Sequence, residues 1–147
     1  MKFRLSRLWQ PLVILSAAAA SPGALAADPQ VDLKTNAGTI RLELYPAKSP
    51  KTVENFLQYV KAGHYNGTVF HRVIPNFMIQ GGGFTQELAE KPTTATVNNE
   101  SRNHLHNERG TIAMARTDDP DSAGAQFFIN VRANLTLGRE ADDTMLW

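Results

Sequence analysis

Residues 70–84 read FHRVIPNFMIQGGGF, and this stretch decides which kind of fold the chain adopts. The segment 68–74, which overlaps the start of this stretch, is rich in β-branched and aromatic residues, which favour an extended strand. The dipeptide Pro-Asn at 75–76 interrupts that strand, because proline has no N–H to donate and asparagine suits turns. Apolar residues return at 77–79 and are followed by Gln80 and by three glycines at 81–83. We therefore predict two short strands joined by a turn, followed by a hinge or a close approach of backbone.

A helix is predicted upstream of this stretch. Ser49 suits an N-cap, and Pro50 suits the first helical position, where its missing N–H has no consequence. Gly63 suits the left-handed residue that ends a helix. Between these signals the apolar residues recur at helical spacing, at Val53, Phe56, Leu57 and Val60. The segment therefore predicts a short amphipathic helix that lies on a sheet.

Four further segments have the pattern of strands. Residues 31–35 and 39–45 alternate apolar and polar side chains on either side of a tight turn, so they predict a hairpin. Residues 110–115 and 126–131 are short apolar runs bounded by turn residues. The polar, asparagine-rich segment 84–109 predicts a long surface loop. Many short strands with one helix indicate a mainly β, antiparallel barrel or sandwich, and alternation alone does not separate the two.

Composition limits the classes of function. The chain has 147 residues, enough for one domain, and its 42% hydrophobic and 20% charged residues are typical of a globular protein. A formal net charge of +1 gives no sign of a nucleic-acid or membrane partner. The absence of cysteine excludes a disulfide scaffold, a thiol nucleophile and a zinc–thiolate site.

No other motif supports a cofactor or a metal. Gly81–Gly83 lacks the Lys-Ser/Thr of a phosphate loop. His104 and His106 lack a third ligand at a recognisable spacing. The aspartates at 118–121 lack the glycine and the closing glutamate of a calcium loop. We therefore predict that the protein needs no cofactor and no metal.

The first 26 residues have the pattern of a signal peptide. A basic start is followed by an apolar run at 12–20 and by Ala24-Leu25-Ala26, a small-x-small cleavage site. An uncleaved anchor is the alternative, but the run is short and alanine-rich for a membrane span. We predict cleavage after about Ala26 and a periplasmic location, which suits a cysteine-free chain. A domain over 27–137 and a tail at 138–147 without a usable period then follow.

Several segments together resemble the cyclophilin family of peptidyl-prolyl cis/trans isomerases. The main match is 70–82, and it continues through GTIAMA at 110–115, SAGAQFFI at 122–129 and TVENF at 52–56. The similarity runs from about Val31 to Leu137, and the signal peptide and asparagine-rich loop resemble the periplasmic bacterial branch. The resemblance implies an antiparallel β-barrel capped by helices, with a peptide groove on its outer face.

The resemblance also implies roles for individual residues. Arg72 matches the catalytic arginine. The walls of the proline pocket correspond to Phe77, Met78 and Phe128. The polar groups that hold the substrate backbone correspond to Gln80 and Gln126, and the segment whose backbone pairs with the substrate corresponds to Ala115 and Arg116.

These residue types suit the reaction on physical grounds. Rotation about an X–Pro bond meets a barrier of about 20 kcal/mol, because the amide is conjugated. In the twisted transition state the proline nitrogen becomes pyramidal and accepts a hydrogen bond. A guanidinium aimed at that nitrogen favours the twisted state over the planar one, and Arg72 stays charged at any working pH. Apolar walls grip the proline ring and exclude water.

The resemblance ends near Leu137. Thr136 stands where the family has an aromatic residue, Gly138 stands where it has an aspartate, and the tail resembles no family strand or helix. We therefore expect a barrel that is incomplete at its C-terminal end, without its last strands and second helix. Two alternatives to a working isomerase are a module that only binds proline-containing peptides and a non-functional fragment. We expect a monomer whose partners are unfolded or proline-containing polypeptides, with no nucleic acid and, after signal cleavage, no membrane.

Overall fold

The computed structural model describes residues 27–137, and the predictions for 1–26 and 138–147 lie outside them. The elements of this part are, in order, β1 (Gln30–Thr35), β2 (Gly38–Glu43), α1 (Pro50–Lys61), β3 (Arg72–Ile74), β4 (Met78–Gly81), the 3-10 helix η1 (Ser101–Asn103), β5 (Ile112–Met114) and β6 (Phe127–Asn130). All pairings between these strands are antiparallel. The predicted fold class, mainly β and antiparallel with one capping helix, is confirmed.

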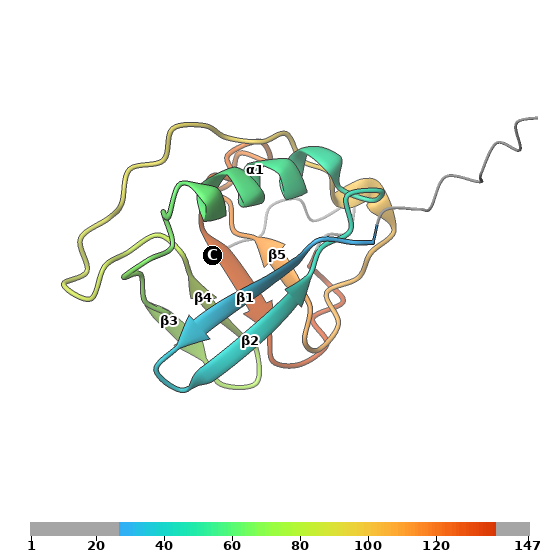
Figure 1. Cartoon of the computed structure of the whole chain (residues 1–147). Helices are drawn as coiled ribbons and strands as arrows, with labels where there is room; N and C mark the ends of the chain where they lie inside the picture. The colour runs from blue at the N-terminus through green and yellow to red at the C-terminus, as the bar shows by residue number, and fades with distance from the viewer. Residues whose placement is uncertain (1–26, 138–147) are drawn as a thin grey trace, which may run out of the picture.

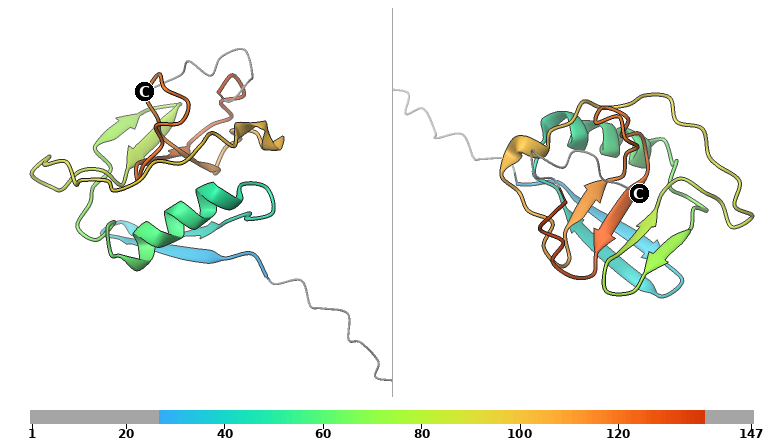
Figure 2. Two further views of the ribbon diagram at one scale, coloured as in Figure 1. Left: turned by 90° about the horizontal axis from the view of Figure 1, so that it is seen from above. Right: turned by 180° about the vertical axis from the view of Figure 1, so that it is seen from behind.

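The strands form two layers. The hairpin β1–β2 is one layer, and a four-stranded sheet in the order β3-β4-β6-β5 is the other (Figures 1 and 2). Helix α1 lies across one end of both layers (Figure 1). Among residues 27–137, the named strands of the hairpin do not pair with those of the four-stranded sheet.

A hydrophobic core fills the space between the two layers and the helix. Leu42 comes from the hairpin, Phe56 from α1, and Phe127 and Ile129 from β6. The ring of Phe127 meets the ring of Phe56 edge-on, with centroids 5.9 Å apart. Such contacts give aromatic pairs stability beyond their buried area. The alternation predicted for the hairpin is therefore the pattern that puts one face into this core.

The strand predicted over 68–74 is shorter than expected. Of residues 68–74, only those of β3 pair with β4, whereas Thr68 forms a single bridge to Thr85. The partner chain turns away after β4, because Gly82 has a φ of +86° and so leaves the extended conformation. The residues before β3 consequently pair with the start of the long loop.

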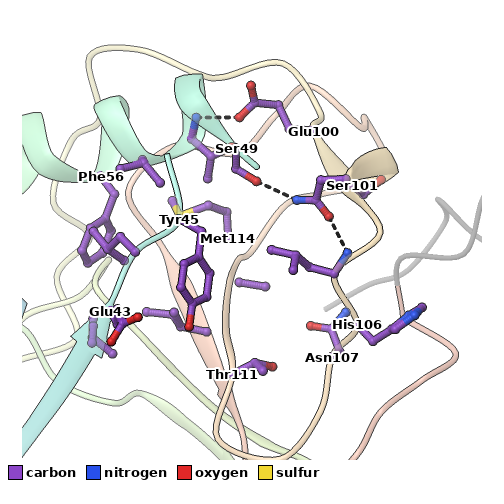
Figure 3. A pocket seen from close by; sticks show the side chains of 18 of the residues that line it. Glu43, Tyr45, Ser49, Phe56, Glu100, Ser101, His106, Asn107, Thr111 and Met114 are labelled. Carbon is purple, nitrogen blue, oxygen red and sulfur yellow. Dashed lines mark hydrogen bonds between the residues drawn. The ribbon is translucent and has the colours of Figure 1, made fainter. Parts of the chain in front are cut away.

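Helix α1 lies where the sequence predicts it, and Ser49 occupies the N-cap position as predicted, but its side chain does not cap the helix. Ser49 makes no side-chain capping bond, and its hydroxyl instead accepts a hydrogen bond from Asn103 Nδ2 at 2.6 Å. The carboxylate of Glu100 accepts the N–H groups of Lys51 at 3.2 Å and Thr52 at 2.8 Å. Figure 3 shows Glu100 beside the start of the helix, with one of these two bonds drawn. A carboxylate suits this position because its two oxygens satisfy two free backbone N–H groups and its negative charge complements the positive end of the helix dipole.

The other end of α1 follows the prediction. Gly63 has a φ of +69°, and the N–H of His64 donates to the carbonyl of Tyr59 at 3.0 Å. These features form a left-handed helix stop that only glycine adopts without strain. The sequence signal for this boundary is local, and it is confirmed.

We expect Glu100→Ala to destabilise the protein by about 1 kcal/mol, the usual effect of losing an N-terminal cap. Burial alone raises the pKa of Glu100, but the N–H groups of Thr52 and Lys51 outweigh it and hold that pKa below its ordinary value of 4.5. A carboxyl with a lowered folded-state pKa contributes its stability above the unfolded value and loses it as the pH falls through the folded value.

Denaturant unfolding of wild type and Glu100→Ala checks this expectation. The two proteins should differ fully near pH 7, and the difference should shrink at low pH, as the pH falls through the lowered folded-state pKa of Glu100. Glu100→Gln, which keeps an acceptor but no charge, should lie between them. An equal difference at both pH values would show that the charge of Glu100 is not what caps the helix.

Candidate active site

Side chains from four strands form a row across the four-stranded sheet. The register places Arg72 opposite Gln80, and Gln80 opposite Phe128. Ala113 of β5 completes the row opposite Phe128. Directly opposed residues of an antiparallel sheet point to the same face, on strands about 4.8 Å apart. Arg72, Gln80 and Phe128 therefore share one face of the sheet.

This face is turned away from the core. Phe127 and Ile129 flank Phe128 in β6, and both belong to the core between the layers. Because successive side chains of a strand point to opposite faces, Phe128 points away from that core. Ile79, next to Gln80, packs against the core in the same way. The row thus lies on the outer face of the sheet.

The predicted walls of the proline pocket also lie outside the core cluster, which includes none of Phe77, Met78 and Phe128. Met78 shares the face of Gln80, two residues away along β4, and is only 3% exposed. Little of its side chain is therefore exposed on that face. Phe77 lies in the turn before β4, where its N–H donates to the carbonyl of Ile74 at 3.1 Å. Of the three predicted wall residues, Phe128 is the one that belongs to the row.

Arg72 supplies the charge in this row. Within residues 27–137 no hydrogen bond or ion pair engages its guanidinium. Burial lowers the pKa of the neighbouring His71, and the charge of Arg72 lowers it further. The His71 ring is therefore neutral near pH 7, and it stacks at a tilt on Phe84, with ring centroids 4.5 Å apart. The guanidinium donors of Arg72 are thus not committed to another described residue.

The two predicted glutamines meet. Gln80 Nε2 donates to Gln126 Oε1 at 3.0 Å, so the two amides act as a pair. The structure brings Arg72 and this pair to the same sheet face through the register of β3 and β4.

Ala115 and Arg116 follow β5, and part of their hydrogen bonding is internal. The Ala115 N–H donates to the carbonyl of Gln126 at 2.9 Å, and Arg116 Nη1 donates to the carbonyl of Pro120 at 2.9 Å. The N–H of Ala115 is therefore not available for the substrate contact that the resemblance implied for this segment.

Three asparagines that the sequence analysis did not single out support this site. Asn134 Nδ2 donates to the carbonyl of Phe77 at 2.9 Å and to Asn130 Oδ1 at 2.7 Å. Asn130, which is 1% exposed, in turn donates to Asn107 Oδ1 at 3.0 Å. A satisfied buried polar network of this kind holds its members in one arrangement. The network joins separate segments of the chain, so no motif or spacing predicts it. The one signal in the sequence is that two of the asparagines, Asn130 and Asn134, occur next to apolar residues.

A separate cavity lies away from this row. It measures about 450 Å³ and separates β2 from β5, with Phe56 and Met114 on its apolar side (Figure 3). Two of its polar side chains have structural partners: Glu100 caps α1, and Asn107 Nδ2 donates to the carbonyl of Leu137 at 3.0 Å.

The edges of strands β2 and β5 form part of the wall of this cavity. The Leu44 N–H donates to Pro29, so by alternation the backbone of Arg41 and Glu43 faces away from β1. The Ala115 N–H bond to Gln126 likewise turns the backbone of Ile112 and Met114 away from β6. All four residues line the cavity. Among the described strands, β2 and β5 each have a neighbour on one side only.

The described residues 27–137 contain no group of three or more His, Asp or Glu side chains placed to hold a metal ion. The same residues contain no helix of the length and apolarity that a membrane span requires.

The model of a protein family described as "Cyclophilin type peptidyl-prolyl cis-trans isomerase/CLD" matches residues 30–142. The chain belongs to the cyclophilin family. Over 117 residues this cyclophilin is 57% identical to the peptidyl-prolyl cis-trans isomerase cyp18 of Streptomyces antibioticus, covering 80% of this chain and 70% of that protein. It is 50% identical over 117 residues to isomerase B of Escherichia coli K12, covering 80% and 71%. A relative from Acinetobacter baylyi is 56% identical over 117 residues, covering 80% and 62%.

These relatives are all named isomerases, so the predicted family and enzyme class are confirmed at the level of the family. The chain spans between 62% and 71% of their length.

Solved structures agree with the assignment of the fold. A cyclophilin from Cryptosporidium parvum, solved in the presence of the dipeptide Ala-Pro, is 30% identical with a TM-score of 0.63, and the match covers 74% of this chain and 72% of that one. Cyclophilin AquaCyp293 from Hirschia baltica is 26% identical with a TM-score of 0.68, covering 77% and 61%. The fold of this cyclophilin is therefore similar to that of solved members of the family.

Proposed function

We propose that this cyclophilin accelerates cis/trans rotation about X–Pro bonds in unfolded polypeptides, with Arg72 as its catalytic residue. One observation carries the proposal: the register puts Arg72, Gln80 and Phe128 in one row on the outer face of the sheet. A cation, an amide and an aromatic ring are thus adjacent where an extended peptide has access.

Each member of the row has a distinct task in this proposal. Phe128, together with Phe77 and Met78, holds the proline ring by apolar burial, worth about 1.5–3 kcal/mol for a fully buried side chain. Gln80 and Gln126 hydrogen-bond the substrate backbone and fix its position along the sheet. Arg72 donates to the proline nitrogen once that nitrogen becomes pyramidal, so its bond forms in the twisted state and not in the planar one.

The reaction breaks no covalent bond, so neither a nucleophile nor a proton shuttle is needed. The neutral His71 fits this scheme, since no proton has to move. The uncommitted guanidinium of Arg72 supports it as well, because a donor already held in an ion pair would have to be released first.

The experiment is a protease-coupled assay with a short Ala-Pro peptide and the full chain. We expect the slow phase of cleavage, which reports cis-to-trans rotation, to accelerate in proportion to the protein concentration. A slow phase that keeps its uncatalysed rate, at protein concentrations where the protein is folded, would overturn the proposal.

A second candidate function is binding of proline-containing segments without catalysis. The cavity between β2 and β5 favours it, because among the described strands neither β2 nor β5 has a partner on the side that faces the cavity, and unpaired edges weaken a sheet that must hold Arg72 in place. Peptide titration followed by NMR, run beside the assay, separates the two candidates. Shifts at Gln80 and Phe128 without any rate acceleration would favour the binding module.

We further propose that the protein acts on exported chains as a periplasmic monomer, without a nucleic-acid or membrane partner after signal cleavage. The support is the basic start, the apolar run and the Ala24-Leu25-Ala26 site in the sequence. Expression in a Gram-negative host followed by fractionation and intact-mass analysis tests it. We expect a periplasmic product that begins near Ala27 and elutes as a monomer. An uncleaved product in the cytoplasmic fraction would contradict the proposal.

A further inference from the structure

The space beside Gly83 is filled by the side chain of Gln126. A Cβ built on Gly83 would lie 2.5 Å from Gln126 Cγ, 2.6 Å from its Cδ and 2.7 Å from its Nε2. These are distances that real Cβ atoms do not show, so the two side chains cannot coexist in this arrangement. Gly83 is buried, and its carbonyl accepts the N–H of Lys91 at 2.8 Å, which fixes its backbone.

We propose that Gly83 is a positioning residue for the glutamine pair. The missing side chain leaves the room in which the amide of Gln126 lies, and from there Gln126 Oε1 accepts Gln80 Nε2 at 3.0 Å. Gln80 stands between Arg72 and Phe128 in the row. Residue 83 therefore sets the orientation of two substrate-holding amides without touching the substrate, and in this respect the inference rests on the proposed function.

The backbone of Gly83 does not itself require glycine. Its φ lies outside the left-handed region, unlike the neighbouring Gly82, whose φ is +86°. A Cβ on Gly82 would also lie 2.9 Å from the rings of Phe127 and Tyr65 in the core. For alanine at 83, the three nearest atoms all belong to the flexible side chain of Gln126, from Cγ outward. Gly83→Ala should therefore move Gln126 and leave the fold intact.

The test is a pair of alanine substitutions measured singly and together. In the Ala-Pro assay we expect Gly83→Ala to raise KM about threefold to tenfold with kcat nearly unchanged, as for the loss of one hydrogen bond made equally in ground and transition states. Added to Gln126→Ala, the same substitution should have no further effect on KM, because it acts only through Gln126. Equal KM for wild type and Gly83→Ala, or additive effects in the double variant, would overturn the inference.

A structural readout separates this inference from the proposed function. In the free wild-type protein, NMR should show contacts between the Gly83 Hα protons and the side-chain amide protons of Gln126. In Gly83→Ala the Gln126 amide signals should shift while most core signals stay in place. If wild type shows the contacts but no isomerase activity, the proposed function fails and the packing of Gln126 on Gly83 stands. Absence of the contacts would refute the inference whatever the activity.

Discussion

Arg72→Ala should lower kcat/KM for an Ala-Pro peptide by about a hundredfold or more, the range seen when one preorganised transition-state donor is removed. The reason lies in the proposed reaction, in which a single hydrogen bond to the pyramidal nitrogen distinguishes the twisted from the planar amide. The loss should fall mainly on kcat, because a bond made only in the transition state does not contribute to ground-state binding. The protease-coupled assay measures both constants.

Two further arginine variants serve as controls. Arg72→Lys keeps the charge but loses the planar fork of donors, so it should recover only part of the activity. Arg109→Ala removes an equal charge from an exposed loop position before β5 and should leave kcat/KM unchanged. Unfolding curves of Arg72→Ala should match wild type within about 0.5 kcal/mol, since the guanidinium has no described partner to lose. Full activity of Arg72→Ala would remove the catalytic role of this residue.

Two adjacent phenylalanines should respond in opposite ways to the same substitution. Phe127→Ala should destabilise the protein by about 3–5 kcal/mol, because it empties the centre of the core. Its ring is 4% exposed and packs edge-on against the rings of Phe56, Tyr65 and Phe70. Chemical denaturation measures this loss, and the variant should be at or beyond the limit of stable folding.

Phe128→Ala should leave most of the stability in place and remove a wall of the proline slot. We expect kcat/KM to fall about tenfold to a hundredfold, corresponding to the burial of one aromatic side chain against the proline ring. Circular dichroism melts and the isomerase assay, run on both variants, form a matched pair of the same chemical change one residue apart. A stability loss at Phe128 as large as that at Phe127 would show that Phe128 belongs to the core, against the placement of the row.

The phenylalanine pair also shows how far sequence reasoning reaches. Alternation along a strand already implies that Phe127 and Phe128 face opposite sides of a sheet. Which side is the core depends on partners that lie far away along the chain, such as Phe56 and Leu42. The resemblance to a known family predicts that Phe128 is a site residue, whereas its apolar aromatic side chain alone would predict a place in the core.

Long-range polar contacts were the hardest features to predict. Glu100 accepts the free N–H groups of a helix that begins 50 residues earlier, whereas Ser49, which holds the predicted N-cap position, makes no side-chain capping bond. The asparagine network that holds the carbonyl of Phe77 likewise joins residues from three separate segments. Many side chains of the chain carry an oxygen that could make such a contact, so composition and spacing do not identify the residues that do.

Local patterns along the chain are enough to predict the hairpin, the helix with its glycine stop, the turn at 75–76 and the strands on either side of it. One long motif also identifies the family and the residue types of the site. The tertiary structure alone decided the register that aligns Arg72, Gln80 and Phe128, and the packing of Gln126 over Gly83. The physical reason is that turns and caps follow from the torsion angles of a few consecutive residues, whereas a row across three strands exists only after segments distant in sequence have paired.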